Sequence, residues 1–127
     1  MKALKTIGIV LAIVAGTFVI YNASIDPHYD VNRSLEIQAS PQAVSQVVSD
    51  FTSWPKWSAW FDKDSTMVAA FPGSTAGEGA TYSWTSEMSG NGSMEILDYK
   101  EGKSMTTAIT FDGMGGSTGN WRFEATE

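Results

Sequence analysis

Few side chains in this sequence are suited to acid–base or nucleophilic chemistry. The 127 residues include one histidine, His28, and no cysteine. A catalytic base needs a positioned partner inside a pocket, and His28 lies in a polar stretch that we expect outside the core. Ser83, Ser86 and Ser89 have no other histidine to activate them, which argues against a Ser-His-Asp triad. The lack of cysteine excludes disulfides and thiolate metal sites.

Two loop carboxylates, Glu78 and Asp112, are the weak catalytic candidates. Both lie in loops between predicted strands, where either could act as an acid if it were removed from water. Exposed loop carboxylates are the more ordinary interpretation. Asp62 and Asp64 could ligate a hard cation, but a complete calcium loop needs more oxygen ligands and a distal Glu. We therefore favour a solvated turn at that position, and we predict no metal site and no cofactor.

Aromatic and methionine side chains on otherwise apolar strand faces are the stronger site candidates. Flat rings and adaptable methionine suit an apolar ligand, although core packing would use the same residues. Arg33 falls on the inward face of the first predicted strand, where it could meet a ligand carboxylate or, as we favour, form a salt bridge at the sheet end. The predicted ligand-binding residues are Arg33, Trp60, Tyr82, Trp84, Met94, Ile109 and Trp121.

The elements that must position these residues begin with a strand and a helix. Residues 31–39 alternate between two faces, which predicts a strand with one face buried. Ser40 is a good N-cap and Pro41 suits the first helical position, so a helix should start there. Apolar residues at three- and four-residue spacing extend it to Phe51 and face it toward a core.

Three tryptophans follow that helix at a constant spacing. Trp54, Trp57 and Trp60 repeat every three residues, which predicts a second short helix or turn with its indoles on one side. Core packing is the favoured interpretation, and a ligand-stacking platform is the alternative.

The rest of the chain has the rhythm of an antiparallel meander. Short alternating segments are separated by glycine-rich turns, and no crossover helices lie between them, which disfavours a parallel α/β fold. We predict an α+β fold with about five strands, at 66–71, 80–85, 92–99, 104–111 and 119–123.

The N-terminus is long and apolar enough to cross a bilayer. Residues 6–21 carry no charge, and the uncharged run of 18 residues to Ala23 would span roughly 27 Å as a helix. A cleaved signal peptide is the alternative. We predict an uncleaved membrane anchor over residues 1–23, a tether over 24–30 and a folded domain over 31–127. Membrane contact would run through residues 6–23.

Charge sets the expected topology and excludes one class of partner. Lys2 and Lys5 precede the apolar run, so the positive-inside rule keeps the N-terminus cytoplasmic and places the domain outside the cytoplasm, in the periplasm or extracellular space. From Asp26 onward, 14 acidic residues face 6 basic ones, which argues against nucleic-acid binding.

A small-residue repeat in the anchor suggests weak self-association. Gly8, Ala12 and Gly16 recur every four residues and would share one helix face. Small residues are common in such helices, and that is the favoured explanation.

Residues 31–61, VNRSLEIQASPQAVSQVVSDFTSWPKWSAWF, together with glycine motifs at 77–80, 92–94 and 113–118, resemble a known family. It is the membrane-anchored polyketide cyclase/dehydrase-like branch of the START-like (SRPBCC) superfamily. The resemblance covers about three quarters of the chain. It implies a helix-grip fold, in which a curved antiparallel sheet wraps a long C-terminal helix around an apolar cavity.

The resemblance also implies a strand and a long helix beyond Phe123 and Glu124, whereas this sequence ends at Glu127. We therefore expect a C-terminally truncated chain that lacks the gripping helix, or a cover supplied by another subunit.

Three functions remain open at this point. A module that binds a small hydrophobic ligand or lipid fits best, because it needs only a cavity. A cyclase or dehydratase acting on a polyketide-like substrate is the second. A membrane-tethered domain that docks a protein partner is the third.

Overall fold

The computed structural model describes residues 1–26, 28 and 30–126. It divides into two compact units, Met1–Leu35 and Glu36–Glu127.

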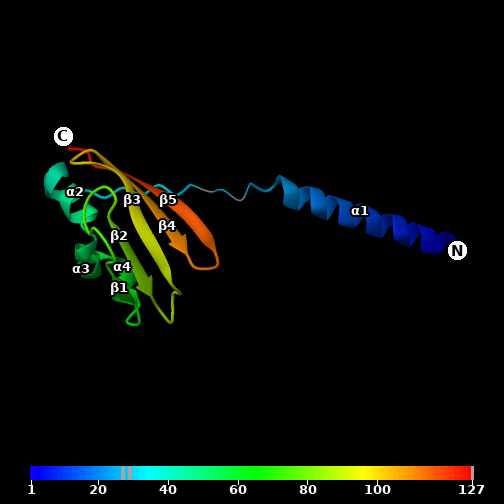
Figure 1. Ribbon diagram of the computed structural model, residues 1–127. Coiled ribbons are helices and arrows are strands. Elements are labelled where there is room, and N and C mark those ends of the chain that lie inside the picture. Colours follow the sequence, from blue (N-terminus) through cyan, green and yellow to red (C-terminus); the bar gives the residue numbers. More distant parts are fainter. Residues whose placement is uncertain (27, 29, 127) are drawn as a thin grey trace. The chain divides into compact units, whose positions relative to one another are not determined.

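The first unit contains one long helix. Helix α1 spans Lys2–Ser24, and its Lys5–Ser24 portion, 20 residues, is long and apolar enough to cross a membrane (Figure 1). At 1.5 Å per residue that portion is about 30 Å long, the thickness of a hydrocarbon core. The expected apolar N-terminal helix is therefore present, while its insertion and orientation stay predictions.

The predicted first strand is absent. Residues 31–37 have no regular secondary structure, and every side chain from 31 to 40 is exposed. Alternation permits a strand but does not supply the neighbouring strand whose backbone groups it must pair with. Arg33 donates a hydrogen bond to the carbonyl oxygen of its neighbour Asn32, at 2.8 Å. The expectation that Arg33 lies on a buried strand face is therefore wrong.

Helix α2, Pro41–Ser49, starts where Ser40 and Pro41 predicted it. The Ser40 hydroxyl accepts a hydrogen bond from the Ala43 backbone N–H at 3.2 Å, which satisfies one free donor of the first turn. The buried residues of α2 are polar, Ser45 and Ser49. Small hydroxylated side chains allow the helix to lie close to the turn between two strands, where the Ser45 hydroxyl accepts from the Gly102 N–H at 2.8 Å.

The tryptophan repeat forms two short helices rather than one. A single 3₁₀ turn, Phe51–Ser53, leads into α3, Trp54–Trp57, and α4, Ala59–Lys63, follows. Ser58 between them is extended (φ −72°, ψ 127°), so the repeat does not continue as one helix. Trp54 is buried, whereas Trp57 and Trp60 are exposed.

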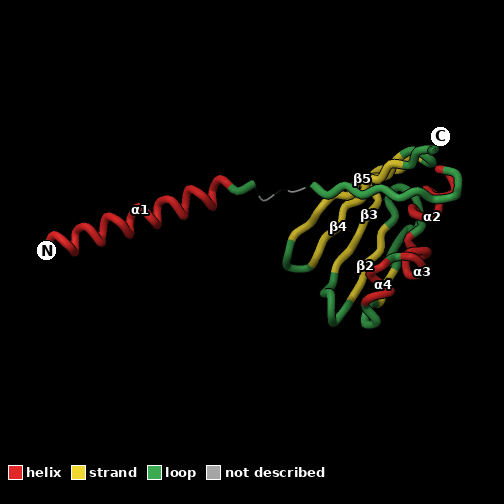
Figure 2. Tube along the Cα trace, turned by 180° about the vertical axis from the view of Figure 1, so that it is seen from behind, coloured by secondary structure: helices red, strands yellow, loops and turns green. Residues whose placement is uncertain are grey.

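The sheet has five antiparallel strands in chain order, as the meander prediction required. Figure 1 and Figure 2 show α2, α3 and α4 gathered at the side that carries β1 and β2, while the turn joining β4 to β5 lies away from them. The strands are β1 (Val68–Ala70), β2 (Thr81–Thr85), β3 (Gly92–Lys100), β4 (Ser104–Phe111) and β5 (Gly115–Arg122).

One irregularity divides β3. Ile96 pairs with Thr107 and Asp98 with Thr106, so Leu97 is an extra residue in the ladder. A bulge of this kind switches which residues face inward. Met94 and Ile96 are buried before it, and beyond it Tyr99 packs against the core instead.

The core lies between the short helices and the inner face of β2, β3 and β4. Its buried apolar residues are Phe51, Trp54, Ala80, Tyr82, Trp84, Met94, Ile96 and Met105.

Candidate functional site

A cavity of about 250 Å³ opens between the sheet and helices α3 and α4. Such a volume is below the usual range for drug-sized ligands and above an engineered cavity of about 150 Å³ that holds benzene. It therefore suits a molecule, or part of one, with one or two rings or a short chain. The lining residues are Trp54, Trp60, Met67, Tyr82, Trp84, Ser89, Met94, Ile109, Phe111 and Met114.

Two rows of cross-strand neighbours form the sheet wall of the cavity. Tyr82 pairs with Met94, and Met94 pairs with Ile109. The adjacent row runs from Trp84 through Gly92 to Phe111. Because these positions are two residues apart on each strand, alternation brings both rows to the same face.

Gly92 is required in the second row because the Trp84 ring occupies the space of its missing side chain. A Cβ built on Gly92 would lie 2.3 Å from a carbon of that ring and 2.6 Å from the Thr110 carbonyl oxygen. The absence of a side chain at one strand position therefore sets where an indole wall of the cavity lies.

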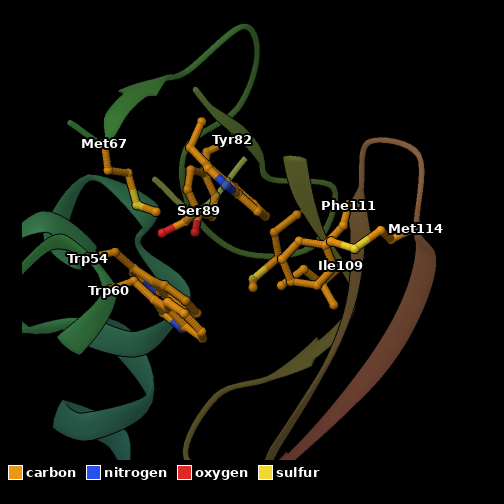
Figure 3. Close-up of a pocket in the computed structure, with 10 residues that line it drawn as sticks. Trp54, Trp60, Met67, Tyr82, Ser89, Ile109, Phe111 and Met114 are labelled. Carbon is orange, nitrogen blue, oxygen red and sulfur yellow. The ribbon is translucent and has the colours of Figure 1, made fainter. Parts of the chain in front are cut away.

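The helical wall and the rim come from the tryptophan segment and the β4–β5 turn. Trp54 is fixed in the core, where its indole N–H donates to the Val48 carbonyl oxygen at 2.9 Å. Trp60 and Met114 form the rim and are 62% and 77% exposed. Figure 3 shows Trp54, Trp60, Met67 and Tyr82 on one side, with Ile109, Phe111 and Met114 facing them.

One polar end interrupts this apolar lining. Ser89 lines the cavity and donates its hydroxyl proton to Asp64 Oδ2 at 2.6 Å. Asp64 lies immediately beyond α4 and is only 4% exposed. Its other donors are the Ser86 hydroxyl, to the same Oδ2, and the Thr66 hydroxyl and backbone N–H, to Oδ1 at 2.6 and 2.9 Å. The earlier expectation of a solvated turn is wrong for Asp64, although Asp62 is exposed.

These hydrogen bonds determine the charge state of the polar end. Donation from Ser86, then Ser89 and Thr66, holds the pKa of Asp64 well below its usual range, so the carboxylate stays ionised. Burial raises the pKa of the Tyr82 phenol to about 12, so that hydroxyl stays protonated.

The predicted ligand-binding residues separate into two groups. Trp60, Tyr82, Trp84, Met94 and Ile109 all line the cavity, and ligand contact by them stays a prediction. Trp121 does not line it. Its ring packs edge-on to Trp54 at 6.0 Å, and its N–H donates to the Thr107 hydroxyl at 3.3 Å. Arg33 belongs to the unit Met1–Leu35, and ligand contact by it stays a prediction.

The two catalytic candidates are not in the cavity wall. Glu78 lies in the loop between β1 and β2, and Asp112 in the turn between β4 and β5. Both are exposed, so neither is removed from water as its proposed acid role would require.

Sequence reasoning missed five lining residues as ligand contacts, namely Trp54, Met67, Ser89, Phe111 and Met114. Strand alternation could have added Phe111, because it shares a face with Ile109. No sequence signal links Ser89 to Asp64, 25 residues earlier. Within the described part of the chain, no three His, Cys, Asp or Glu side chains lie together as a metal site would need.

Comparison with known proteins gives one match. The model of the family described as polyketide cyclase / dehydrase and lipid transport matches residues 28–127. No curated protein matches the chain, and no solved structure does.

Proposed function

The chain belongs to the polyketide cyclase/dehydrase and lipid transport family, and on that premise we propose that its cavity binds a small hydrophobic ligand or part of a lipid. Family membership supports a hydrophobic-ligand-binding domain of SRPBCC type. The observation that carries the finer proposal is the lining itself, in which nine of the ten residues are aromatic, methionine or isoleucine. Such surface gains about 25 cal/mol for each Å² that a ligand removes from water.

Binding is favoured over catalysis by what the cavity walls offer. Tyr82 is the only lining residue with an ionisable side chain, and its raised pKa keeps it neutral. General acid–base chemistry needs a group whose pKa lies near the working pH. The cyclase or dehydratase alternative would require one of the exposed carboxylates to reach the ligand.

A membrane location is the second part of the proposal. An apolar α1 would anchor the domain at a bilayer, where hydrophobic ligands concentrate, and Lys2 and Lys5 would keep the N-terminus cytoplasmic. Because the chain has no cysteine, single cysteines at Ala3 and Glu36 can be labelled from one side of intact cells. We expect a membrane-impermeant maleimide to reach only the cysteine at Glu36. Labelling of only the cysteine at Ala3 would show that the chain has the opposite orientation.

Ligand binding can be tested with an uncharged fluorescent dye. The full chain is placed in lipid nanodiscs, N-phenyl-1-naphthylamine is titrated in, and the signal of empty nanodiscs is subtracted. We expect a saturable rise in dye fluorescence. Ile109→Trp adds bulk to the cavity wall and should weaken binding at least tenfold.

Thr110→Trp is the matched control, because it makes the same change at the next position on β4, which is exposed. It should leave dye affinity unchanged. Equal affinities for the two variants would place binding elsewhere. Native mass spectrometry after gentle extraction adds an independent check. A retained apolar molecule supports the proposal, whereas a stoichiometric protein would favour the interaction-domain alternative.

A further inference from the structure

The polar end of the cavity has a fixed hydrogen-bond direction. The ionised Asp64 carboxylate can accept hydrogen bonds but cannot donate them. Each of the two serine hydroxyls on its Oδ2 must therefore point its proton toward the carboxylate. Ser86 and Ser89 therefore have lone pairs, and no proton, for any other partner.

The two serines differ in whether those lone pairs are already used. The Ser86 hydroxyl oxygen accepts from the backbone N–H groups of Met88 and Ser89, at 3.0 and 2.8 Å. Among the described residues, nothing donates to the Ser89 hydroxyl oxygen, although Ser89 lines the cavity. An unused acceptor thus faces the ligand space beside apolar walls (Figure 3).

Charge at the cavity adds a second constraint. None of the ten lining residues is basic, and a buried carboxylate lies one hydrogen bond beyond Ser89. A ligand carboxylate or phosphate would lose its water there without finding a cation, and it would approach a like charge. Anionic ligands are therefore disfavoured.

We propose that the ligand is an uncharged alcohol or phenol whose O–H donates to the Ser89 hydroxyl oxygen while its apolar body fills the cavity. Ser89 then acts as a specificity residue whose polarity is set by Asp64. This inference rests on the proposed function and narrows it, because a ketone, an ether or a carboxylate with the same body has no proton to donate and cannot make that bond.

The test uses three probes with one naphthalene body, namely 2-naphthol, 2-methoxynaphthalene and 2-naphthoate. Each displaces N-phenyl-1-naphthylamine from the full chain in nanodiscs. Transfer from water costs the alcohol more than the ether, so the native chain should bind 2-naphthol at least as tightly as the ether only if the hydroxyl finds an acceptor. The carboxylate should bind at least tenfold more weakly than the alcohol.

Variants assign the preference to Ser89. In Ser89→Ala the ratio of ether to alcohol dissociation constants should fall about fivefold to tenfold, the range expected for one hydrogen bond. Ser89→Thr retains the hydroxyl and should retain most of the ratio. Ser83→Ala, on the other face of the sheet and away from the lining, should leave it unchanged.

Three outcomes would overturn the inference. They are tighter binding of the ether than the alcohol by the native chain, an unchanged ratio in Ser89→Ala, and naphthoate binding equal to that of naphthol. The native chain alone decides the first and third, so the test holds even if Ser89→Ala does not fold. Dye binding without an alcohol preference overturns only this inference, whereas absence of dye binding overturns the proposed function as well.

Discussion

The inner face of the sheet has two ends that are built from similar apolar residues and covered differently. At the closed end, Ile96 and Met105 are fully buried in the same core cluster as Phe51. At the open end, Ile109 and Phe111 are half-buried and Met114 is exposed.

The cover explains the difference between the closed end and the open end. Helix α2 is tied to the β3–β4 turn through Ser45, and Phe51 in the 3₁₀ turn after α2 packs on Tyr82 with ring centres 4.8 Å apart. The open end has Trp54, Trp60 and Met67 opposite it, and Trp60 is largely exposed. Apolar composition therefore does not separate core from site, whereas the packing of the covering helix does.

The largest expected effect is a contrast between two phenylalanines, one at each end. Phe51→Ala should lower the free energy of unfolding by about 3–5 kcal/mol, because it leaves a void in a fully packed region. Phe111→Ala at the open end should cost about 1 kcal/mol, because its ring is already partly in water. Urea unfolding of the full chain, followed by near-UV circular dichroism, measures both. Equal costs would contradict the division into a closed and an open end.

Gly92 gives the next effect. Gly92→Ala forces the Trp84 ring away from the strand and should cost about 1–3 kcal/mol, the usual range for overpacking. Dye affinity should fall as well, because that ring is a cavity wall. Gly73→Ala is the control, since its added Cβ meets only the Thr81 hydroxyl at 3.4 Å, and it should change stability by less than about 0.5 kcal/mol. Equal changes in stability and dye affinity for the two variants would show that Gly92 has no special role in placing the Trp84 ring.

Substitution of Asp64 at the open end should have a smaller effect on the free energy of unfolding, and that effect should depend on pH. The folded pKa of Asp64 is depressed, so the stability it contributes is fully present above the unfolded value of about 3.9 and is lost as the pH falls below it. The native chain should therefore have a higher urea midpoint than Asp64→Asn at pH 7, and the difference should shrink toward pH 3. Asp62→Asn, at an exposed carboxylate, should show no such trend. A constant difference for Asp64→Asn would disprove the linkage.

The smallest effect is expected for the two exposed loop carboxylates. Glu78→Gln and Asp112→Asn should each change stability by less than about 0.5 kcal/mol and leave dye affinity unchanged, because neither side chain lines the cavity. The dye titration and the urea midpoint measure these two quantities. A loss of dye binding in either variant would show that the loop carrying the changed residue also takes part in dye binding.

Local signals made much of the fold predictable. Ser40 and Pro41 define a helix start by themselves, and the glycine-rich turns separate the strands, so the helix and the meander followed from neighbouring residues. The prediction of a strand at 31–39 was wrong because the alternation of a segment does not encode its pairing with another strand. For the same reason, the three-residue tryptophan repeat did not reveal that the extended Ser58 would separate Trp57 from Trp60.

The cavity was predictable where it depends on alternation and not where it depends on contacts across the chain. Tyr82, Trp84, Met94 and Ile109 were identified because alternate residues share one strand face. Ser89 was not, because its role comes from a buried carboxylate in a different loop. A serine in a turn looks alike in the sequence whether or not such a carboxylate is near.

The extra residue at Leu97 changes which residues of β3 face inward. Before Leu97 the even-numbered Met94 faces the ligand space and Ile96 faces the core. After it the odd-numbered Tyr99 faces α2, where its phenol oxygen lies 3.3 Å from the Ser45 hydroxyl. Deleting Leu97 would remove the bulge and leave Ile96 opposite Thr107, Asp98 opposite Thr106 and Tyr99 opposite Met105, so Tyr99 would still face inward. If Leu97 itself paired with Thr106 in a regular ladder, Asp98 would face inward in place of Tyr99 and α2 would lose this contact. The extra residue is therefore what lets one strand both line the cavity and hold the helix.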